Sequence, residues 1–479
     1  MSIAPEEIRP PMSATVSQPR APRALRPQDA PTPTRPGARI SPNTALAVIA
    51  TGGLAVLGLW WQDTTFVNGL GDWLTNAGRI TGLAAGYTIL VVLALMARVP
   101  ALDRGVGSDR LARWHAAAGR YAVSLAVAHT LLIIWGYAVT ARTSVIAETG
   151  AVVLSYPDVL MATVALGLFL LVGISSARAA RKRLRYETWH LVHLYTYLAI
   201  GLAFSHQFAT GADFTDTRVQ VLWAGFYLVV GGLLVWYRAV TPLVNLARHT
   251  LRVVAVVPHG PDVLSVVVAG RNLARLGAQP GQFFRWRFLT RDLWPAANPY
   301  SLSAAPRGDQ MRITVKNAGA HSDALARLRP GARVLAEGPY GAFTGDAAQR
   351  SLAGRRSGKV LLIGVGIGIT PIRALLETIP AAPGGITLLY RARHSGNLVL
   401  REEIEHVAAA RGARVHYLLG SRHEGSGHLT PAQLLRLVPD LAEHEVYLCG
   451  PDELIGRLAR DLRKAGVSRA AIHFESFTF

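Results

Sequence analysis

The 479-residue sequence contains a single cysteine, Cys449, and this scarcity excludes several kinds of site. One cysteine cannot form an intrachain disulfide, and the thiolate ligands of an iron–sulfur cluster or a structural zinc ion are lacking. Covalent haem attachment is excluded as well, because the C-x-x-C-H signature is absent. The sequence also has no calcium-binding loop of the D-x-[DN]-x-[DN]-G type, which argues against control by calcium. Any metal in this chain must therefore be held by histidine.

Acidic residues are also few, with 30 against 50 lysines and arginines and a formal net charge of +20. Such an excess can indicate nucleic-acid binding, but the basic runs adjoin apolar stretches and lack interleaved aromatic residues that could stack on bases. We therefore expect no nucleic-acid partner. The positive-inside rule accounts for the excess, because the basic residues gather in alternate loops. These are Arg98, Arg104, Arg110 and Arg113 in one loop, and Arg178, Arg181, Lys182, Arg183 and Arg185 in another.

Six long apolar runs in the first half of the chain predict membrane-spanning helices. They cover residues 45–61, 80–99, 114–139, 159–175, 189–208 and 219–236. Residues 1–42 are polar and rich in proline and arginine, which predicts a disordered tail and not a signal peptide. We therefore predict a multi-pass protein of the cell membrane with a transmembrane domain at residues 43–240 and both chain ends in the cytoplasm.

Four histidines lie at matched depths in the third and fifth of these runs. His115 and His129 are 14 residues apart, and His193 and His206 are 13 apart. At about 1.5 Å of rise per residue, each helix separates its two imidazoles by roughly 20 Å, most of a hydrocarbon core about 30 Å thick. A single such histidine could equally be a helix-packing partner. Four in register predict two stacked b-type haems, held by His115 with His193 and by His129 with His206.

The two histidines of the fifth run are not expected to lie on the same face of a regular helix. A step of 14 residues returns to within about 40° of the same helix face, whereas a step of 13 lands about 140° away. The run is therefore expected to contain a kink or a π-bulge, or to present its haems with a tilt. His190 is an alternative to His193 as the inner ligand. Arg120, five residues beyond His115, is either a partner for a haem propionate or a snorkelling interfacial arginine.

The second half of the chain changes to short alternating strands separated by glycine, proline and aspartate. Residues 248–346 predict an antiparallel β-barrel. Residues 357–479 alternate strands with helices, as a doubly wound parallel sheet does.

Three glycines, Gly364, Gly366 and Gly368, follow the first strand of the predicted parallel sheet. At such a turn, glycine lets a pyrophosphate approach the backbone and the N-terminus of the next helix. Arg391 and Arg393 end the second strand, where an acidic residue would indicate NAD. These arginines favour the 2′-phosphate of NADPH, although solvent-exposed arginines without a ligand are the alternative.

Six segments in a fixed order complete the pattern: NPYSLSAAP at 298–306, VKNAGAHS at 315–322, GARVLAEGPYG at 331–341, GVGIGITP at 364–371, YLCGP at 447–451 and HFESFTF at 473–479. Together they resemble the flavin and nicotinamide modules of the ferredoxin–NADP reductase superfamily. With the histidine-bearing runs in front, residues 45–479 resemble a bacterial NADPH oxidase or ferric reductase of the transmembrane cytochrome b type. The resemblance implies a multi-domain membrane protein with a six-helix haem-binding bundle, a FAD-binding β-barrel and a doubly wound α/β NAD(P)-binding domain.

The resemblance also implies roles for particular residues. Tyr300 would pack against the flavin ring and Ser301 would bond near its reactive nitrogen, with Asn298 and Pro299 beside them. Gly319, His321 and Ser322 would lie by the flavin phosphates. Related sequences often place arginine or histidine where this chain has Asn298, so Lys316 or His321 would have to compensate for the missing charge, and FMN is an alternative flavin.

On the nucleotide side, Thr370 and Pro371 would border the nicotinamide nucleotide, and Cys449, Gly450 and Pro451 the nicotinamide ring. Ser301, Cys449, Glu475 and Phe477 would form the catalytic set. Phe477 would cover the flavin, with Phe479 as the alternative.

These features predict an NAD(P)H-dependent flavocytochrome b oxidoreductase. Electrons would pass from cytoplasmic NADPH through FAD and two b-type haems to an acceptor on the outer face. NADH is an alternative donor; oxygen giving superoxide, a ferric chelate, and a quinone or periplasmic protein are alternative acceptors. Two other interpretations stay open, namely a haem-binding membrane sensor or transport protein without turnover, and a membrane-anchored flavin reductase that lacks haem.

Overall fold

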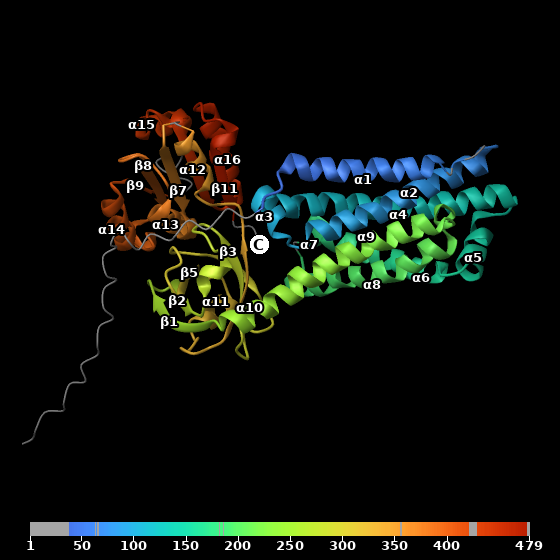
Figure 1. The fold of residues 1–479 in the computed structure, drawn as a ribbon, viewed down its shortest axis with the longest axis horizontal. Coiled ribbons are helices and arrows are strands. Elements are labelled where there is room, and N and C mark those ends of the chain that lie inside the picture. The colour runs from blue at the N-terminus through green and yellow to red at the C-terminus, as the bar shows by residue number, and fades with distance from the viewer. Residues whose placement is uncertain are drawn as a thin grey trace, which may run out of the picture. The chain divides into compact units, whose positions relative to one another are not determined.

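The computed structural model describes residues 38–62, 64, 67–181, 183–184, 186–354, 357–420 and 429–476. Most of the tail predicted at residues 1–42 lies outside these ranges. The first half of the described chain is helical (Figure 1). Its long helices are α1 (Pro42–Gln62), α2 (Leu70–Leu95), α4 (Ser108–Ala141), α6 (Val159–Ser176), α8 (Tyr186–Thr210) and α9 (Thr217–Val235), with the shorter α3 (Pro100–Val106), α5 (Val145–Ser155), α7 (Arg178–Arg181) and α10 (Thr241–His249) between or after them.

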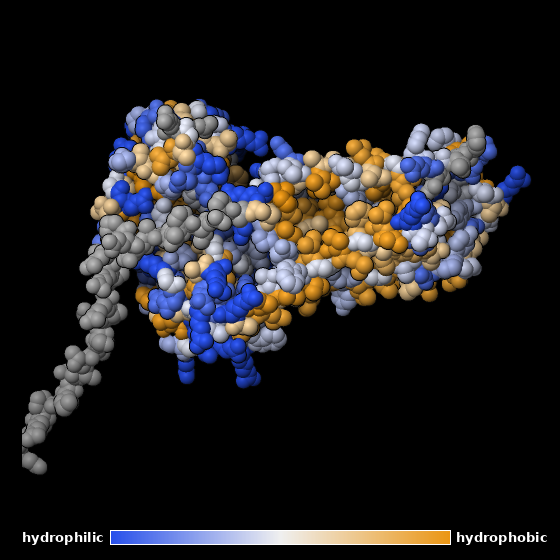
Figure 2. Space-filling model, viewed as in Figure 1, coloured by the Kyte–Doolittle hydropathy of each residue, from blue (hydrophilic) through white to orange (hydrophobic). Residues whose placement is uncertain are grey.

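Five helical segments among the described residues are long and apolar enough to cross a membrane: α1, α2, α4, α6 and the segment Thr217–His249 that begins with α9. The fifth predicted span lies in α8. This helix has 25 residues, but its histidines and its polar residues lower its hydropathy. Side chains on these helices are widely exposed, as at Leu54 (66%) and Leu228 (75%). Apolar residues cover this part of the molecule in Figure 2, as expected of a surface that lipid covers.

Small residues bring α2 and α4 into backbone contact. A Cβ added to Gly71 would lie 2.3 Å from Thr140 Oγ1, and one added to Gly136 would lie 2.8 Å from Thr75 N. Close approach through small residues is the usual way in which membrane helices pack, because lipid provides no hydrophobic drive for their association. This contact determines how deep the side chains of α4 lie beside α2.

Two features of the winding of these helices bear on the sequence predictions. α8 is α-helical throughout, so the 13-residue step is made without a π-bulge in this helix. A π-helical turn occurs instead at Trp236–Val240, directly before Pro242 in the first turn of α10. Proline cannot donate the backbone hydrogen bond that an α-helix requires, which explains a change of winding just ahead of it. Helical structure continues through α10 to His249, and the domain boundary at 240 stays a prediction.

The next part of the chain, here called the two-sheet domain, contains two three-stranded antiparallel sheets in the orders β1-β2-β5 and β4-β3-β6. The strands are β1 (Arg252–Pro258), β2 (Val263–Ala269), β3 (Phe283–Phe288), β4 (Asn298–Ser301), β5 (Gln310–Lys316) and β6 (Val334–Tyr340), and α11 (Ala320–Leu325) follows β5. Isolated bridges at Leu302–Ile313 and Arg252–Arg333 join the edges of the two sheets. Alternating residues such as Phe284, Trp286 and Phe288 point into one buried core.

The last part, here called the parallel-sheet domain, has five parallel strands in the order β11-β10-β7-β8-β9. They are β7 (Lys359–Val365), β8 (Ile386–Ala392), β9 (Arg414–Leu419), β10 (His444–Gly450) and β11 (Ile472–Ser476). Helices α12 (Asp346–Ala353), α13 (Ile369–Thr378), α14 (Arg401–Arg411), α15 (Pro431–Leu437) and α16 (Asp452–Lys464) accompany them. Two separate apolar clusters flank the sheet, as a doubly wound arrangement requires.

Candidate functional site

The four histidines singled out in the sequence meet as two pairs, one ring from α4 and one from α8 in each. The ring centroids of His115 and His193 are 6.0 Å apart, and those of His129 and His206 are 6.2 Å apart. With metal–nitrogen bonds of about 2.0–2.1 Å on either side, two imidazoles that share one metal have ring centroids about 6 Å apart. Each pair is therefore spaced as the two axial ligands of one iron would be.

Hydrogen bonds to Nδ1 orient all four rings. His115 Nδ1 lies 3.1 Å from Val92 O and His129 Nδ1 lies 2.8 Å from Gly78 O, both on α2. His193 Nδ1 lies 3.4 Å from Ser176 Oγ. His206 Nδ1 lies 2.9 Å from Thr210 Oγ1. Because these bonds engage Nδ1, Nε2 is the nitrogen that each ring could offer to a metal, and such orienting bonds are typical of metal-binding histidines.

Gly82 on α2 leaves room for the ring of His129. A Cβ at Gly82 would lie 2.6 Å from His129 Nδ1, so only glycine permits this approach of α4 to α2. Sequence reasoning did not identify Gly82 or the hydrogen-bond acceptors on α2. The signal was available as glycines at positions 71, 78, 82 and 86, which are seven, four and four residues apart.

The other two candidates in the helical region differ in position. His190 lies beside Trp189, with ring centroids 6.4 Å apart, whereas His193 is the residue that meets His115. Arg120 is exposed on α4. In the part of the chain that the structure describes, no three His, Cys, Asp or Glu side chains converge as metal ligands. The two imidazole pairs are the candidate metal sites because of their spacing.

On the two-sheet domain, the predicted flavin residues Asn298, Pro299, Tyr300 and Ser301 form β4. Burial raises the pKa of Tyr300 to about 12, and a hydrogen bond with Asn298 opposes this shift in part. The Trp286 indole donates to Tyr300 O at 3.0 Å. The strand is thus firmly held, with Ser301 at its buried end.

The predicted phosphate-binding residues follow β5. Gly319 has φ +140°, a backbone conformation that favours glycine, and starts the short helix α11. The Ser322 hydroxyl already bonds to Ala318 N and Gly319 O, both at 2.8 Å, and so serves the loop itself. His321 Nε2 is buried with no partner, and burial lowers its pKa. Lys316 is exposed at the end of β5. His321 is therefore the residue of this group that best fits an added ligand.

The glycine turn lies at the topological switch point of the parallel sheet. Strand order reverses between β7 and β10, and ligands of such sheets bind outside the carboxyl ends of the strands at this point. The turn at Gly364, Gly366 and Gly368 ends β7, and Cys449, Gly450 and Pro451 end β10. A Cβ at Gly368 would lie 2.3 Å from Cys449 O, so this glycine lets the two strand ends meet. Thr370 and Pro371 are buried in the first turn of α13 behind them.

Cys449 and Glu475 are neighbours in register on β10 and β11. Burial raises the pKa of the Cys449 thiol, and the nearby Glu475 carboxyl raises it further. Burial also raises the pKa of Glu475 well above its ordinary value, and Glu475 Oε2 has no partner. A buried carboxyl with an unpartnered oxygen beside a buried thiol fits a ligand that accepts or donates a hydrogen bond here. Phe477 and Phe479, the two predicted covers of the flavin, lie outside the described residues.

The two arginines assigned to the 2′-phosphate differ in exposure. Arg391 is buried near the end of β8, in register with Val365, whereas Arg393 is exposed just after the strand. Arg393 is therefore the one that could meet a phosphate without rearrangement.

Contacts also join the helical region to the two-sheet domain. Arg98, just after α2, donates to Glu337 Oε2 on β6 at 2.5 Å, and its guanidinium lies 5.2 Å from the centre of the Tyr340 ring. Since β6 pairs with β3 and β3 with β4, this contact is two strands from the predicted flavin residues.

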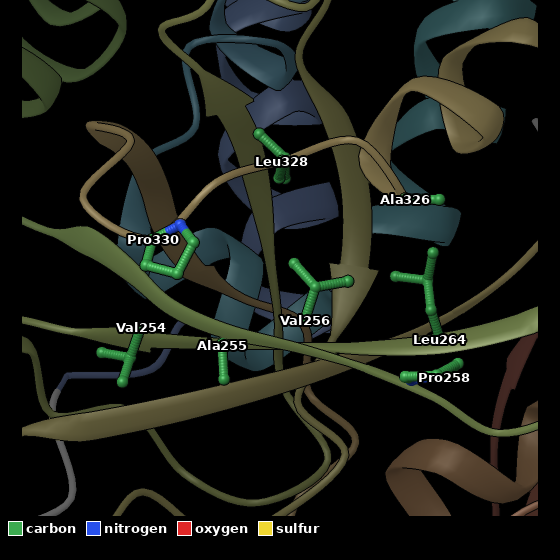
Figure 3. Close-up of a pocket in the computed structure, with 8 residues that line it drawn as sticks. All are labelled: Val254, Ala255, Val256, Pro258, Leu264, Ala326, Leu328 and Pro330. Atoms are coloured by element: carbon green, nitrogen blue, oxygen red, sulfur yellow. The ribbon is translucent and has the colours of Figure 1, made fainter. Parts of the chain in front are cut away.

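An apolar groove with a volume of about 430 Å³ lies on the two-sheet domain (Figure 3). Its lining residues are Val254, Ala255, Val256, Pro258, Leu264, Ala326, Leu328 and Pro330. None of them is a predicted flavin or nucleotide residue, so the groove is distinct from the candidate site.

Comparison with known proteins finds a family model that matches part of each half of the chain. Residues 81–204 match the family model described as "Ferric reductase like transmembrane component", and residues 362–460 match "Oxidoreductase NAD-binding domain". The chain is 30% identical over 197 residues to ferredoxin–NADP reductase B of Sorangium cellulosum, and the match covers 77% of that protein and 37% of this chain. The chain belongs to the ferredoxin–NADP reductase family. It combines that family's FAD- and NAD-binding region with a ferric reductase-like transmembrane region, and it is an NAD(P)H-dependent oxidoreductase.

Other known proteins are also similar to parts of the chain. The ferredoxin reductase component of 3-ketosteroid-9-alpha-monooxygenase from Rhodococcus rhodochrous is 29% identical over 237 residues, which are 47% of this chain and 64% of that protein. A flavohemoprotein of Vibrio cholerae is 28% identical over 226 residues, 44% of this chain and 54% of that protein. Among solved structures, flavohemoglobin from Malassezia yamatoensis matches at 19% identity with a TM-score of 0.43, covering 83% of this chain and 96% of that one.

Proposed function

We propose that this reductase carries electrons across the membrane, from NADPH at the cytoplasmic face through a bound flavin and two b-type haems to an acceptor at the outer face. The observation that supports it most is the double pair of imidazoles on α4 and α8, each spaced for one iron and oriented through Nδ1. The proposed domains are a six-span bundle at 43–240 that includes α8, a FAD-binding barrel at 248–346 and an NAD(P)-binding domain at 357–479.

A flavin is needed because hydride transfer moves two electrons while a haem accepts one. FAD, when bound, can accept two electrons together and release them one at a time. His115 and His193 would hold the inner haem, and His129 and His206 the outer one. The two pairs are separated by about 20 Å along α4, which is most of the hydrocarbon core. The loops rich in arginine then face the cytoplasm together with both chain ends.

The residues around the proposed flavin and nucleotide have separate tasks. Tyr300 and Ser301 on the firmly held β4 would support the flavin ring, and His321 Nε2 would bond to the phosphate end. The glycine turn at Gly364–Gly368 would receive the NADPH pyrophosphate at the N-terminus of α13. Glu475 and Cys449, both buried and both with raised pKa values, would offer hydrogen bonds near the ring where the hydride is transferred.

The experiment is a spectroscopic titration of the purified full chain. Anaerobic addition of NADPH should give the reduced-minus-oxidised difference spectrum of two bis-histidine b haems. His129→Ala and His206→Ala should each remove only the outer haem, whereas His190→Ala is the matched control on α8 and should keep both. Haem that NADPH cannot reduce would indicate a sensor, and a chain without haem would indicate an anchored flavin reductase. Stopped-flow reduction by NADPH and by NADH, followed by oxygen, ferric chelates and quinones as acceptors, then determines donor and acceptor.

A further inference from the structure

A network of ion pairs with a buried centre at Arg373 and Glu377 connects the two-sheet domain to the parallel-sheet domain. Its members are Arg307 and Arg312 from the first domain and Arg373, Glu377 and Glu403 from the second, and we call this set the inter-domain clamp. Arg312 donates to both carboxylate oxygens of Glu403, each at 2.8 Å. Two parallel bonds between a guanidinium and a carboxylate fix orientation as well as distance.

A second set of contacts closes the network at Glu377. Glu377 accepts from Arg307 at 2.7 Å and from Arg373 at 2.9 Å, and the Ala305 backbone N–H donates to it at 2.6 Å. Arg373 also reaches Glu403, at 3.1 Å. The Glu377 side chain is 2% exposed and that of Arg373 is 8% exposed, so these charges are held away from water and bind more strongly than surface pairs.

Each end of the clamp is anchored to a rigid element. Arg373 and Glu377 lie one helical turn apart on α13, which begins directly after the glycine turn. Ser303 and Ala305 follow β4 directly, two and four residues past Ser301. The Ser303 hydroxyl accepts from Arg312 Nε at 3.1 Å and from Thr314 at 2.8 Å, and Thr314 in turn meets Ser265 of β2 at 2.7 Å. The clamp thus ends in the core of the two-sheet domain and not on a loose loop.

We propose that the inter-domain clamp positions the nucleotide turn against the flavin strand for hydride transfer, with Arg312 and Glu403 as positioning residues. This inference rests on the proposed function for the identity of the two ligands. The clamp joins the segment after Ser301 to the helix after Gly368, so it determines the separation of the two sites. Hydride transfer requires reacting atoms about 3–3.5 Å apart, and a misplacement of 1 Å can cost roughly 100-fold in rate.

The test compares Glu403→Gln with Glu405→Gln in the full chain with its cofactors bound. Glu405 lies two residues away on α14 and pairs with Arg401 and Tyr417 inside its own domain, so it is the matched control. Glu403→Gln should slow flavin reduction by NADPH at least about 10-fold at saturating NADPH. Electron transfer from a chemically reduced flavin to haem, the FAD content and the melting temperature should stay as in wild type.

A readout that does not depend on turnover separates this inference from the proposed function. Hydrogen exchange at residues 302–307 should accelerate in Glu403→Gln and not in Glu405→Gln, whether or not NADPH reduces haem. Arg312→Lys keeps the charge, but lysine cannot make two parallel hydrogen bonds to Glu403 and a third to Ser303 at once. This variant should therefore give an intermediate rate of flavin reduction. Unchanged exchange with an unchanged rate of flavin reduction overturns the proposal. Loss of FAD or a fall in melting temperature that parallels the loss of rate also overturns it, because the clamp would then only stabilise the fold.

Discussion

The substitution Gly82→Ala tests the proposed outer haem site without touching a ligand. A Cβ at position 82 would lie 2.6 Å from His129 Nδ1, whereas ordinary contact begins at 3.4 Å, so the ring must retreat by about 0.8 Å. Metal–ligand distances tolerate only about ±0.2 Å. The same movement strains the 2.8 Å bond from His129 to Gly78 O. We therefore expect the outer haem to be lost and the inner haem to remain.

The assay is the ratio of haem to protein in the purified chain, measured as the pyridine haemochrome, together with the FAD content. The ratio should fall from two to one in Gly82→Ala, and NADPH should still reduce the remaining haem. Alanine favours a helix over glycine by about 1 kcal/mol, so loss of helicity does not account for this result. Gly119→Ala on α4 is the control, because a Cβ there meets nothing within 4 Å. Two haems per chain in Gly82→Ala would refute the placement of His129 as an axial ligand.

Three further substitutions test the outer haem site, the glycine turn and the buried carboxyl of Glu475. Thr210→Val removes the oxygen bonded to His206 Nδ1 and should weaken retention of the outer haem about 10- to 100-fold, measured by haem transfer to apomyoglobin; an unchanged transfer rate would contradict the orienting role. Gly368→Ala forces a Cβ to within 2.3 Å of Cys449 O and should reduce NADP⁺ affinity at least 10-fold by calorimetry at unchanged FAD content, whereas equal affinity would argue against the switch-point site. Because the fold raises the pKa of Glu475, this carboxyl binds a proton more tightly in the folded protein than in the unfolded chain. The stability that the protonated carboxyl contributes is complete below the unfolded pKa of about 4.3. This stability is lost as the pH rises through the folded pKa. The melting temperature should therefore fall with rising pH in wild type and fall less in Glu475→Gln, and identical slopes would refute the buried neutral carboxyl.

Much of the fold could be predicted because its signals are local. Apolar length predicted the long helices, and the alternation of strands with helices predicted the parallel sheet, whose order then places the glycine turn at the switch point. The helices α3 and α5 and the continuation of α9 into α10 were not predicted. They are short or amphipathic, and composition alone does not separate them from loops.

The structure brings the ring of His115 to that of His193, the residue that helical rise favours over His190, and the assignment of His193 as a haem ligand stays a prediction. Of the three alternatives expected for the 13-residue step, the π-bulge is excluded in α8, and a kink or a tilted presentation of the haems stays open. The unequal exposure of Arg391 and Arg393 could not be predicted either, since burial at a strand end depends on β7 beside it.

The sequence by itself determined which residue types were available: histidine as the only candidate ligand set, glycine at the turn after β7, and arginine in the loops between apolar runs. Only the tertiary structure decided which carbonyl and hydroxyl oxygens orient each imidazole, and which arginine meets which glutamate between the two C-terminal domains. Composition and periodicity are local properties, because they depend only on residues that are neighbours along the chain. Hydrogen-bond partners come from elements that are tens or hundreds of residues apart. The packing of small residues and buried charges determines how these elements are aligned against one another.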